Sequence, residues 1–412
     1  MPCSEKHQVM TRKTIAVLGT LDTKGHEHAF VEACIRARGH EAVLIDVGTS
    51  GKPQVTPDIQ SEAILPKFER PGDRGACVTA MSEAVPAFVA NLAASGRIDG
   101  ILSLGGGGGT AIASAAMRAL PIGFPKLIVS TLASGNTAHY VGTKDIVMFP
   151  SIVDVAGLNA ISKTIFTQAA AAICGMVEAD SDTKGSRPII AASMFGNTTD
   201  CVNIAKKVLE DAGYQVLVFH ATGTGGRTME ALIESGMVAG VLDITTTEWA
   251  DELVGGTLSA GPDRLSAAAR AGVPAIVAPG CLDMVNFGER ASVPEKFEGR
   301  NFYIHNPQVT LMRTTPEENA QLGSILAEKV NTYTAPVSVL LPTKAISVIS
   351  AKGQPFHYPA ADLALFRAIK ACLRADIPLI ELECEINDAR FATACAEQLL
   401  ALLRSSQATL LT

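Results

Sequence analysis

The 412-residue chain is poor in aromatic and charged residues, and it has no excess of positive charge. Aromatic residues make up 5% of it, with a single tryptophan, and charged residues 18%, with a net charge of −7. Proteins that bind nucleic acid or anionic membranes generally present basic patches, and those that bind single strands add aromatic stacking platforms. The composition therefore predicts no nucleic-acid partner and no membrane partner.

Long apolar runs and paired cysteines are missing as well. No stretch of 18 apolar residues runs without a polar interruption, and residues 1–8 contain no apolar core like that of a signal peptide. The nine cysteines are scattered singly, with no CxxC pair, which is typical of reduced core thiols rather than of disulfides or a zinc site. We therefore expect a soluble, cytoplasmic protein.

What the chain does contain is an internal repeat of buried strands and amphipathic helices. This alternation is typical of parallel sheets with crossover helices. Five predicted strands recur in the same order in both halves: residues 14–20, 40–46, 99–104, 123–130 and 145–154 match residues 189–196, 214–220, 239–244, 272–279 and 301–310.

The repeat predicts an α/β fold with two Rossmann-like domains, each built on a mainly parallel sheet. We place the boundary in the polar link of residues 180–187, so that the domains span residues 1–183 and 184–412. The tail contributes further predicted strands and helices that we expect to extend the second sheet: residues 337–341, 362–374, 377–383 and 390–404.

Helical periodicity also predicts which faces pack on the sheets. Small and apolar residues recur every three or four positions in the helix after the first strand of each half. They are Phe30, Ala33, Cys34 and Ala37 in the first half, and Val202, Ala205, Leu209 and Ala212 in the second.

A run of five glycines, Gly105, Gly106, Gly107, Gly108 and Gly109, separates a strand from a helix in the first half. Glycines at this place let several backbone N–H groups converge on an anion, with the helix dipole behind them. The run predicts phosphate binding; the alternative is a flexible loop without a ligand. The lysine of a Walker A loop is missing, as is a GxGxxG after the first strand.

Other polar residues follow the strands of the first half, where ligands of parallel sheets bind. Asp22 is a candidate ligand or an N-cap of the first helix, Lys24 a candidate phosphate contact, and Asp46 a candidate ribose-binding acid. The remaining candidates for cofactor binding are Thr20, Thr23, Thr110, Ser130, Thr131, Ser134 and Gly135.

The strand ends of the second half carry histidines, acids and arginines, which predict catalysis. Arg227 and Arg313 are candidate anion clamps, because a guanidinium makes bidentate contacts to phosphate or carboxylate. The other candidates are His220, Asp243, Glu248 and His305. These four could in principle ligate a metal, but no HxH or HExxH spacing supports this, and structural hydrogen bonds are the alternative.

Six segments resemble the ATP-binding domain family of the tomato mosaic virus resistance protein, which is also widespread in bacteria. They are residues 15–27, 123–135, 151–159, 218–236, 282–290 and 305–315, and the resemblance covers essentially the whole chain. It implies an ATP-binding or Mg-ATP-binding protein with two Rossmann-like subdomains, often a dimer. The sequence departs from the family pattern at Gly107, where a serine is usual, and around residues 344–358.

We expect an enzyme that holds ATP and Mg²⁺ at the glycine run. It would act on a small organic acid or phosphorylated metabolite in the cleft between the domains, as an ATP-dependent ligase or phosphotransferase. One alternative is a nucleotide-dependent protein-binding module without turnover. Another is a metal-dependent lyase or hydrolase. We also expect a homodimer.

Overall fold

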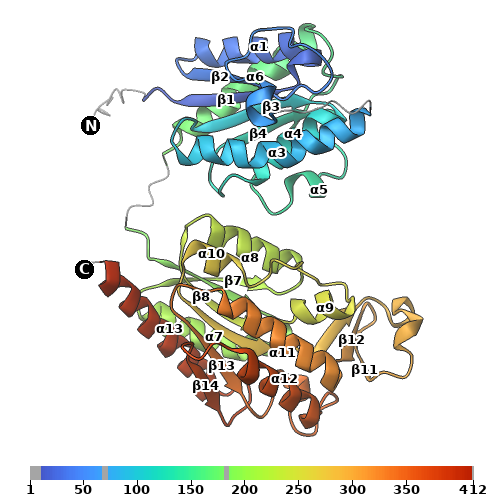
Figure 1. Cartoon of the computed structure of the whole chain (residues 1–412), viewed down its shortest axis with the longest axis vertical. Helices are drawn as coiled ribbons and strands as arrows, with labels where there is room; N and C mark the ends of the chain where they lie inside the picture. Colours follow the sequence, from blue (N-terminus) through green and yellow to red (C-terminus); the bar gives the residue numbers. More distant parts are fainter. Residues whose placement is uncertain (1–10, 67–72, 181–184, 411–412) are drawn as a thin grey trace, which may run out of the picture. The chain divides into compact units, whose positions relative to one another are not determined.

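The computed structural model describes residues 11–66, 73–180 and 185–410 (Figure 1). Residues 1–8, and residues 181–184 of the polar link, therefore lie outside the described residues. The chain divides into two compact units, Met1–Thr183 and Lys184–Thr412. Each unit is a sheet of parallel strands with helices on both faces.

The first unit contains a five-stranded sheet in the order β2-β1-β3-β4-β5, and every neighbouring pair is parallel. This is the flavodoxin-like doubly wound order, whose ligands bind at the switch point between β1 and β3. Gly19 of β1 is in register with Asp46 of β2, and Gly105 of β3 with Ser130 of β4, so the carboxyl ends meet at one edge. The strands are β1 Thr14–Gly19, β2 Glu41–Asp46, β3 Gly100–Gly105, β4 Lys126–Ser130 and β5 Val147–Pro150.

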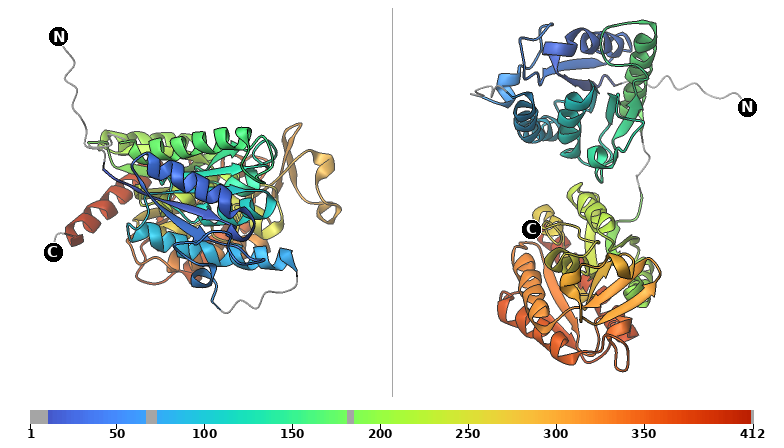
Figure 2. Two further views of the ribbon diagram at one scale, coloured as in Figure 1. Left: turned by 90° about the horizontal axis from the view of Figure 1, so that it is seen from above. Right: turned by 90° about the vertical axis from the view of Figure 1, so that its right-hand side faces the viewer.

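Helices cover both faces of this sheet (Figures 1 and 2). The first face packs against α1 Leu21–Ala37 and α6 Ala160–Glu178, and the second against α3 Arg74–Ala94 and α4 Gly107–Arg118. Two short helices, α2 Ser61–Ile64 and α5 Ala138–Val141, complete the unit.

The predicted packing face of α1 is right for Phe30 and Cys34, which pack against the core, and wrong for its two alanines. Val31 and Ile35 are fully buried, together with His28, whereas Ala33 and Ala37 are exposed. A buried histidine interrupts the apolar pattern of this helix, and alanines on the neighbouring face imitate that pattern. In α7 Thr199–Asp211 the prediction holds for Val202, Ala205 and Leu209, although Ala212 is exposed.

Helices α3 and α6 are long and apolar enough to cross a membrane by length and composition alone. Both nevertheless pack on the sheet, through buried residues such as Met81 and Val85 of α3 and Phe166 and Ile173 of α6. Core helices of α/β domains pass the same test, so the two helices are weak evidence for a span. Cytoplasmic location stays a prediction.

The second unit repeats the architecture with six parallel strands in the order β14-β13-β9-β8-β6-β7. Its first four strands along the chain have the same relative order as those of the first unit, which agrees with the predicted repeat. The tail extends this sheet as expected. The strands are β6 Ile189–Met194, β7 Gln215–His220, β8 Val238–Thr245, β9 Ala275–Gly280, β13 Val337–Pro342 and β14 Leu379–Leu382.

Helices again lie on both faces of the second sheet. One face packs against α7 and α13 Ala389–Leu410. The other packs against α8 Thr224–Glu234, α9 Glu248–Val254, α10 Ala267–Ala271, α11 Pro316–Asn331 and α12 Pro359–Cys372.

The fifth match of the predicted repeat is wrong. Residues 301–310 contain β11 Phe302–Asn306, which belongs to a separate antiparallel sheet with β12 Val309–Arg313 and β10 Met284–Phe287. Asn306 pairs with Val309, so the strands are joined through the Asn-Pro turn signal at position 306. A connection this short can only join antiparallel strands.

Candidate functional site

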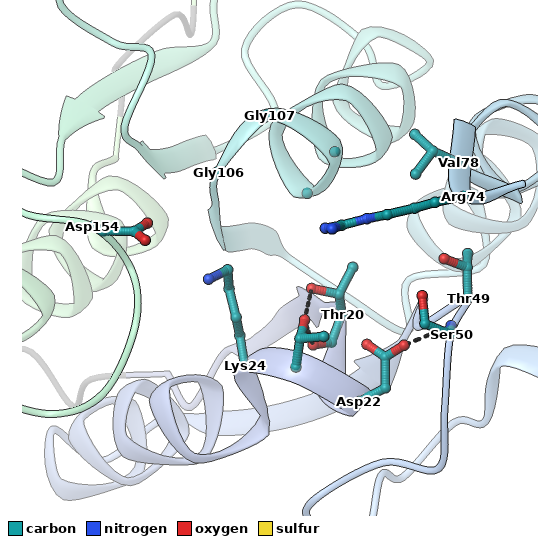
Figure 3. Close-up of a pocket in the computed structure, with 13 residues that line it drawn as sticks. Thr20, Asp22, Lys24, Thr49, Ser50, Arg74, Val78, Gly106, Gly107 and Asp154 are labelled. Carbon is teal, nitrogen blue, oxygen red and sulfur yellow. Dashed lines mark hydrogen bonds between the residues drawn. The ribbon is translucent and has the colours of Figure 1, made fainter. Parts of the chain in front are cut away.

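A pocket of about 210 Å³ lies at the carboxyl end of the first sheet (Figure 3). Its walls come from the loops after β2 and β5 and from the starts of α1, α3 and α4, so it includes the β1/β3 switch point. The thirteen lining residues are Thr20, Asp22, Thr23, Lys24, Thr49, Ser50, Arg74, Val78, Gly106, Gly107, Gly108, Gly109 and Asp154.

The glycine run supplies backbone donors to this pocket. Gly106 is the N-cap of α4, and no side chain caps the helix. The amide N–H groups of Gly107, Gly108 and Gly109 therefore have no acceptor within the helix, and the positive end of its dipole faces the same space. This arrangement suits an anionic ligand.

The fold itself requires a glycine at only one end of the run. A Cβ on Gly105 would lie 2.7 Å from the backbone nitrogen of Thr110, which is a clash. A Cβ on Gly107 would meet nothing within 4 Å, and on Gly106 and Gly109 nothing nearer than 3.9 and 3.6 Å. None of the five glycines adopts a positive φ. A Cβ on Gly108 would lie 3.3 Å from Cγ2 of Val78, which is a tight contact. The fold therefore does not require glycine at positions 106, 107 and 109, where its absence of a side chain keeps the pocket open.

Two cationic side chains flank the start of α4. Lys24 lies at a kink in α1, with φ −135° and ψ 29°, and its ammonium donates to the backbone carbonyl of Val155. Arg74 is the first residue of α3, is exposed, and has no ion-pair partner among the described residues. Figure 3 shows the two side chains entering the pocket from opposite sides, below Gly106 and Gly107.

Two carboxylates also line the pocket. Oδ2 of Asp22 accepts hydrogen bonds from the backbone N–H groups of Ser50 (2.7 Å) and Gly51 (3.1 Å). Its Oδ1 is buried without a hydrogen-bond partner among the described residues. Asp22 does not cap α1, whose N-cap is Thr20 and which has no side-chain cap, so that alternative is wrong. Asp154 extends from the opposite wall toward Lys24 (Figure 3).

His28 connects two segments that lead to pocket residues, the start of α1 and the end of β3. Its ring is 0% exposed, with Nδ1 2.7 Å from the carbonyl oxygen of Lys24 and Nε2 3.4 Å from the backbone nitrogen of Leu104. A neutral ring protonated on Nδ1 satisfies both contacts, and burial lowers the pKa of His28 below its ordinary value. Gly19 leaves room for the ring, since a Cβ there would lie 2.1 Å from Nε2. The ring thus joins the kink at Lys24 to the strand that precedes the glycine run.

The structure brings eight of the predicted residues of the first half into the pocket: Thr20, Asp22, Thr23, Lys24, Gly106, Gly107, Gly108 and Gly109. Asp46 is instead 2% exposed and accepts hydrogen bonds from the backbone N–H groups of Leu21 and Gly48. Burial raises the pKa of Asp46. It holds the loops together and does not line the pocket.

The other predicted residues of the first half lie around the pocket rather than in its wall. Thr110 and Ser130 are buried and bonded to each other through their hydroxyls at 2.7 Å. Gly105, Thr131, Ser134 and Gly135 are also absent from the lining.

Sequence reasoning missed five lining residues: Thr49, Ser50, Arg74, Val78 and Asp154. Three of them follow the carboxyl ends of β2 and β5, so the strand-end rule could have found them. Arg74 and Val78 come from a helix, and no local signal marks their approach.

In the second unit, a glycine-rich loop is already occupied by a side chain of the same unit. Oε1 of Glu248 accepts hydrogen bonds from the backbone N–H groups of Gly223 (2.7 Å) and Gly226 (3.0 Å). Nε of Arg264 donates to Oε2 of Glu248 at 2.6 Å. The amides that could have bound an external anion hold this carboxylate instead.

Arg264 is the centre of a buried ion cluster that the sequence did not reveal. It is 1% exposed and donates to both carboxylate oxygens of Asp243, at 2.6 and 2.7 Å, and to Glu230 at 3.0 Å. Asp243 also accepts a hydrogen bond from Ser193. The cluster gives Asp243 and Glu248 structural partners at the strand ends.

The switch point of the second sheet, between β6 and β8, is likewise closed. The hydroxyls of Thr198 and Thr245 are 2.7 Å apart, and both residues are fully buried. Arg313 is buried too, donating to Asp362 at 2.5 Å and to the carbonyl oxygen of Phe356 at 2.9 Å. Arg313 is therefore committed to its own unit.

The last three predicted residues are exposed and are not brought together. His220 ends β7, His305 lies in β11, and Arg227 donates to the carbonyl oxygen of Ser259 at 3.2 Å. No hydrogen bond or ion pair joins any two of them within the described part of the chain. In that same part, no three His, Cys, Asp or Glu residues gather in a way that could hold a metal ion.

Comparison with known proteins assigns both units. The model described as the uncharacterised protein family (UPF0261) N-terminal domain matches residues 13–182, and the corresponding C-terminal domain model matches residues 187–403. A UPF0261 protein of Clostridium tetani is 49% identical over 397 residues, covering 94% of this chain and 98% of that protein.

A plant protein is also similar. The ToMV resistance protein Tm-1(GCR237) of Solanum lycopersicum is 42% identical over 337 residues, which are 79% of this chain and 44% of that protein. This chain thus corresponds to less than half of the plant protein. Among solved structures, the glycosyltransferase SnogD from Streptomyces nogalater aligns over 95% of this chain and 100% of its own, at 10% identity and a TM-score of 0.21.

Proposed function

Because this chain belongs to the uncharacterised protein family UPF0261, we propose its function from the site itself: the first unit binds the phosphate groups of ATP together with Mg²⁺. The predicted relationship to the tomato mosaic virus resistance protein is confirmed by the comparison with the plant chain. Membership of the family assigns no reaction, so the pocket carries the proposal.

The observation that carries it is the start of α4. Three backbone amides without intrahelical acceptors face a pocket, and the fold does not require glycine at two of the three residues that bear them, Gly107 and Gly109. Glycine in a helix is less favourable than alanine by about 1 kcal/mol per residue. A bound group that approaches the backbone closely accounts for this cost, and phosphate at a helix N-terminus is the common case.

The side chains of the pocket fit the same ligand. Lys24 and Arg74 would neutralise phosphate charge, and the hydroxyls of Thr20 and Thr23 can donate to its oxygens.

Mg²⁺ fits the acidic side chains of the pocket. In nucleotide sites Mg²⁺ is bound through one or two carboxylates and the substrate phosphates. Asp22, with an unpartnered buried oxygen, and Asp154 are the residues that would hold it. Mg²⁺ would there offset the repulsion between these carboxylates and the phosphate groups.

We further propose an ATP-dependent reaction, of the ligase or phosphotransferase kind, on a small organic acid or phosphorylated metabolite. His220, Arg227 and His305 are the predicted catalytic residues that remain exposed. The internal pairing of Asp243, Glu248 and Arg313 favours a second candidate, a module that binds nucleotide and a protein partner without turnover. A homodimer stays a prediction, which light scattering in solution would test.

Isothermal titration with Mg-ATP tests the binding step. We expect saturable binding by the wild type and a loss of about tenfold or more in the Lys24→Met variant, because charge-assisted hydrogen bonds contribute about 1.5–3 kcal/mol. The matched control is Lys163→Met, an exposed lysine on α6 of the same unit. Absence of binding by the wild type would contradict the proposal. Release of ADP or AMP from labelled ATP with candidate acids separates the enzyme from the binding module.

A further inference from the structure

We infer that this pocket selects its ligand by the phosphate groups alone, and that it does not read the base or the ribose. Nucleoside triphosphates with different bases, and inorganic tripolyphosphate, would then bind with similar affinity. This inference rests on the proposed function and narrows it, because it states which part of the ligand the first unit recognises.

The pocket is smaller than sites that enclose a whole ligand. Its volume is about 210 Å³. Sites that enclose a complete small-molecule ligand or cofactor generally measure about 300–1,000 Å³. This volume fits phosphate groups and a metal ion better than it fits a whole nucleotide. The base and ribose of a bound nucleotide would therefore extend beyond its walls.

The described walls of the pocket consist almost entirely of polar residues and glycine. Among the described residues that line the pocket, Val78 alone has an apolar side chain, and none of the thirteen is aromatic. Sites that recognise a base offer it a flat apolar or aromatic surface, with a few polar groups for its edge. A Cβ on Gly108 would lie 3.3 Å from Cγ2 of Val78, so this side chain packs close to the start of α4.

The acids in and near the pocket do not supply a ribose ligand at the end of β2. In dinucleotide sites a carboxylate near the end of a neighbouring strand binds the ribose hydroxyls. Asp46 has that position in the sequence, but its Oδ1 accepts hydrogen bonds from the backbone amides of Leu21 and Gly48, and the residue lies outside the lining. Oδ2 of Asp22 is occupied by the amides of Ser50 and Gly51. Asp154, the other acid of the lining, follows β5, at the opposite edge of the sheet from β2. Within the described residues, no acid at the end of β2 is therefore left as a ribose ligand in this pocket.

What remains is a set of groups complementary to phosphate. The free amides of α4, the ammonium of Lys24 and the guanidinium of Arg74 surround one small space (Figure 3). Each of these groups interacts with phosphate oxygens and none distinguishes adenine from guanine.

The experiment is a set of titrations of the full-length protein, at fixed Mg²⁺, with ATP, GTP, tripolyphosphate and adenosine. We expect the dissociation constants of ATP and GTP to agree within about threefold, tripolyphosphate to displace bound ATP, and adenosine to displace none. Arg74→Gln should weaken all three anions by the same factor, about tenfold or more, since a charge-assisted contact is lost from each. Lys163→Met should change none of them.

The outcomes separate this inference from the proposed function. Binding of ATP with GTP more than about thirtyfold weaker, or displacement of ATP by adenosine, would overturn the inference and leave ATP binding intact. Binding of tripolyphosphate without ATP or GTP would support phosphate recognition and overturn nucleotide binding. Failure of all three anions to bind would overturn both.

Discussion

Replacement of Gly107 by alanine should stabilise the first unit while it weakens ligand binding. Gly107 is the first helical residue of α4, its φ is not positive, and a Cβ there would meet no atom within 4 Å. Glycine-to-alanine changes at compatible positions stabilise proteins by about 0.4–1 kcal/mol, because the unfolded chain has fewer conformations to lose. For a unit of this size, that corresponds to a rise in Tm of roughly 1–4 °C.

The same methyl group would stand in the pocket, where phosphate groups are proposed to approach the backbone. A displacement that costs one hydrogen bond to a charged oxygen lowers affinity by about 1.5–3 kcal/mol, or roughly 10- to 150-fold. Calorimetric melting without ligand gives the stability, and titration with Mg-ATP gives the affinity. The two effects have opposite signs, so a general disturbance of the fold cannot imitate them.

Gly105→Ala is the matched control. Its Cβ would lie 2.7 Å from the Thr110 nitrogen, and overpacking of this kind costs about 1–3 kcal/mol. We therefore expect the control to melt at a lower temperature than the wild type. If Gly107→Ala is also destabilised, glycine is a requirement of the fold. If it binds Mg-ATP as the wild type does, the start of α4 is not the phosphate site. Either result would refute the reasoning.

Three further predictions follow from contacts of single residues. Arg264→Met should destabilise the second unit by about 3–5 kcal/mol in urea unfolding, because it leaves buried carboxylates without their cation; a loss below about 1 kcal/mol would contradict this. Arg74→Met should weaken Mg-ATP binding without lowering Tm, since the side chain is exposed and has no ion-pair partner among the described residues; a drop in Tm of several degrees would instead indicate a structural role. The folded-state pKa of His28 lies below that of the unfolded chain, near 6.5, so the unfolded state binds more protons as the pH falls. The free energy of unfolding of the first unit should therefore decrease below about pH 6.5, by at most about 1.4 kcal/mol per pH unit from this residue, and a His28→Gln variant that keeps the whole decrease would exclude His28 as its cause.

Much of the fold could be predicted from the sequence. Parallel strands covered on both faces are nearly continuous apolar runs, and residues 14–20 and 189–196 have that form. The prediction failed at residues 301–310, because the Asn-Pro turn at position 306 makes a hairpin out of what looked like another crossover strand. It failed in part on the face of α1, where His28 occupies a buried position at which helical periodicity predicts an apolar residue.

The site was predictable only in part, for a different reason. The strand-end rule located the glycine run and Lys24 correctly, because both positions depend on the topology alone. It could not tell which strand-end side chains are satisfied by their own unit. The partner of Asp243 and Glu248 is Arg264, which follows no strand directly and which no local pattern connects to them.

The Glu248 carboxylate acts as an internal ligand of the glycine-rich loop, because it belongs to the same chain. The amides of Gly223 and Gly226 face it at a fixed effective concentration, whatever the composition of the surrounding solution. If the first unit depends on a diffusing anion, its free energy of unfolding rises with the concentration of that anion, by RT ln(1 + [L]/Kd). The stabilities of the two halves of the repeat would then depend differently on the concentration of that anion. A fall in the concentration of that anion would lower the free energy of unfolding of the first unit, whereas the contact of Glu248 with its loop has no such dependence.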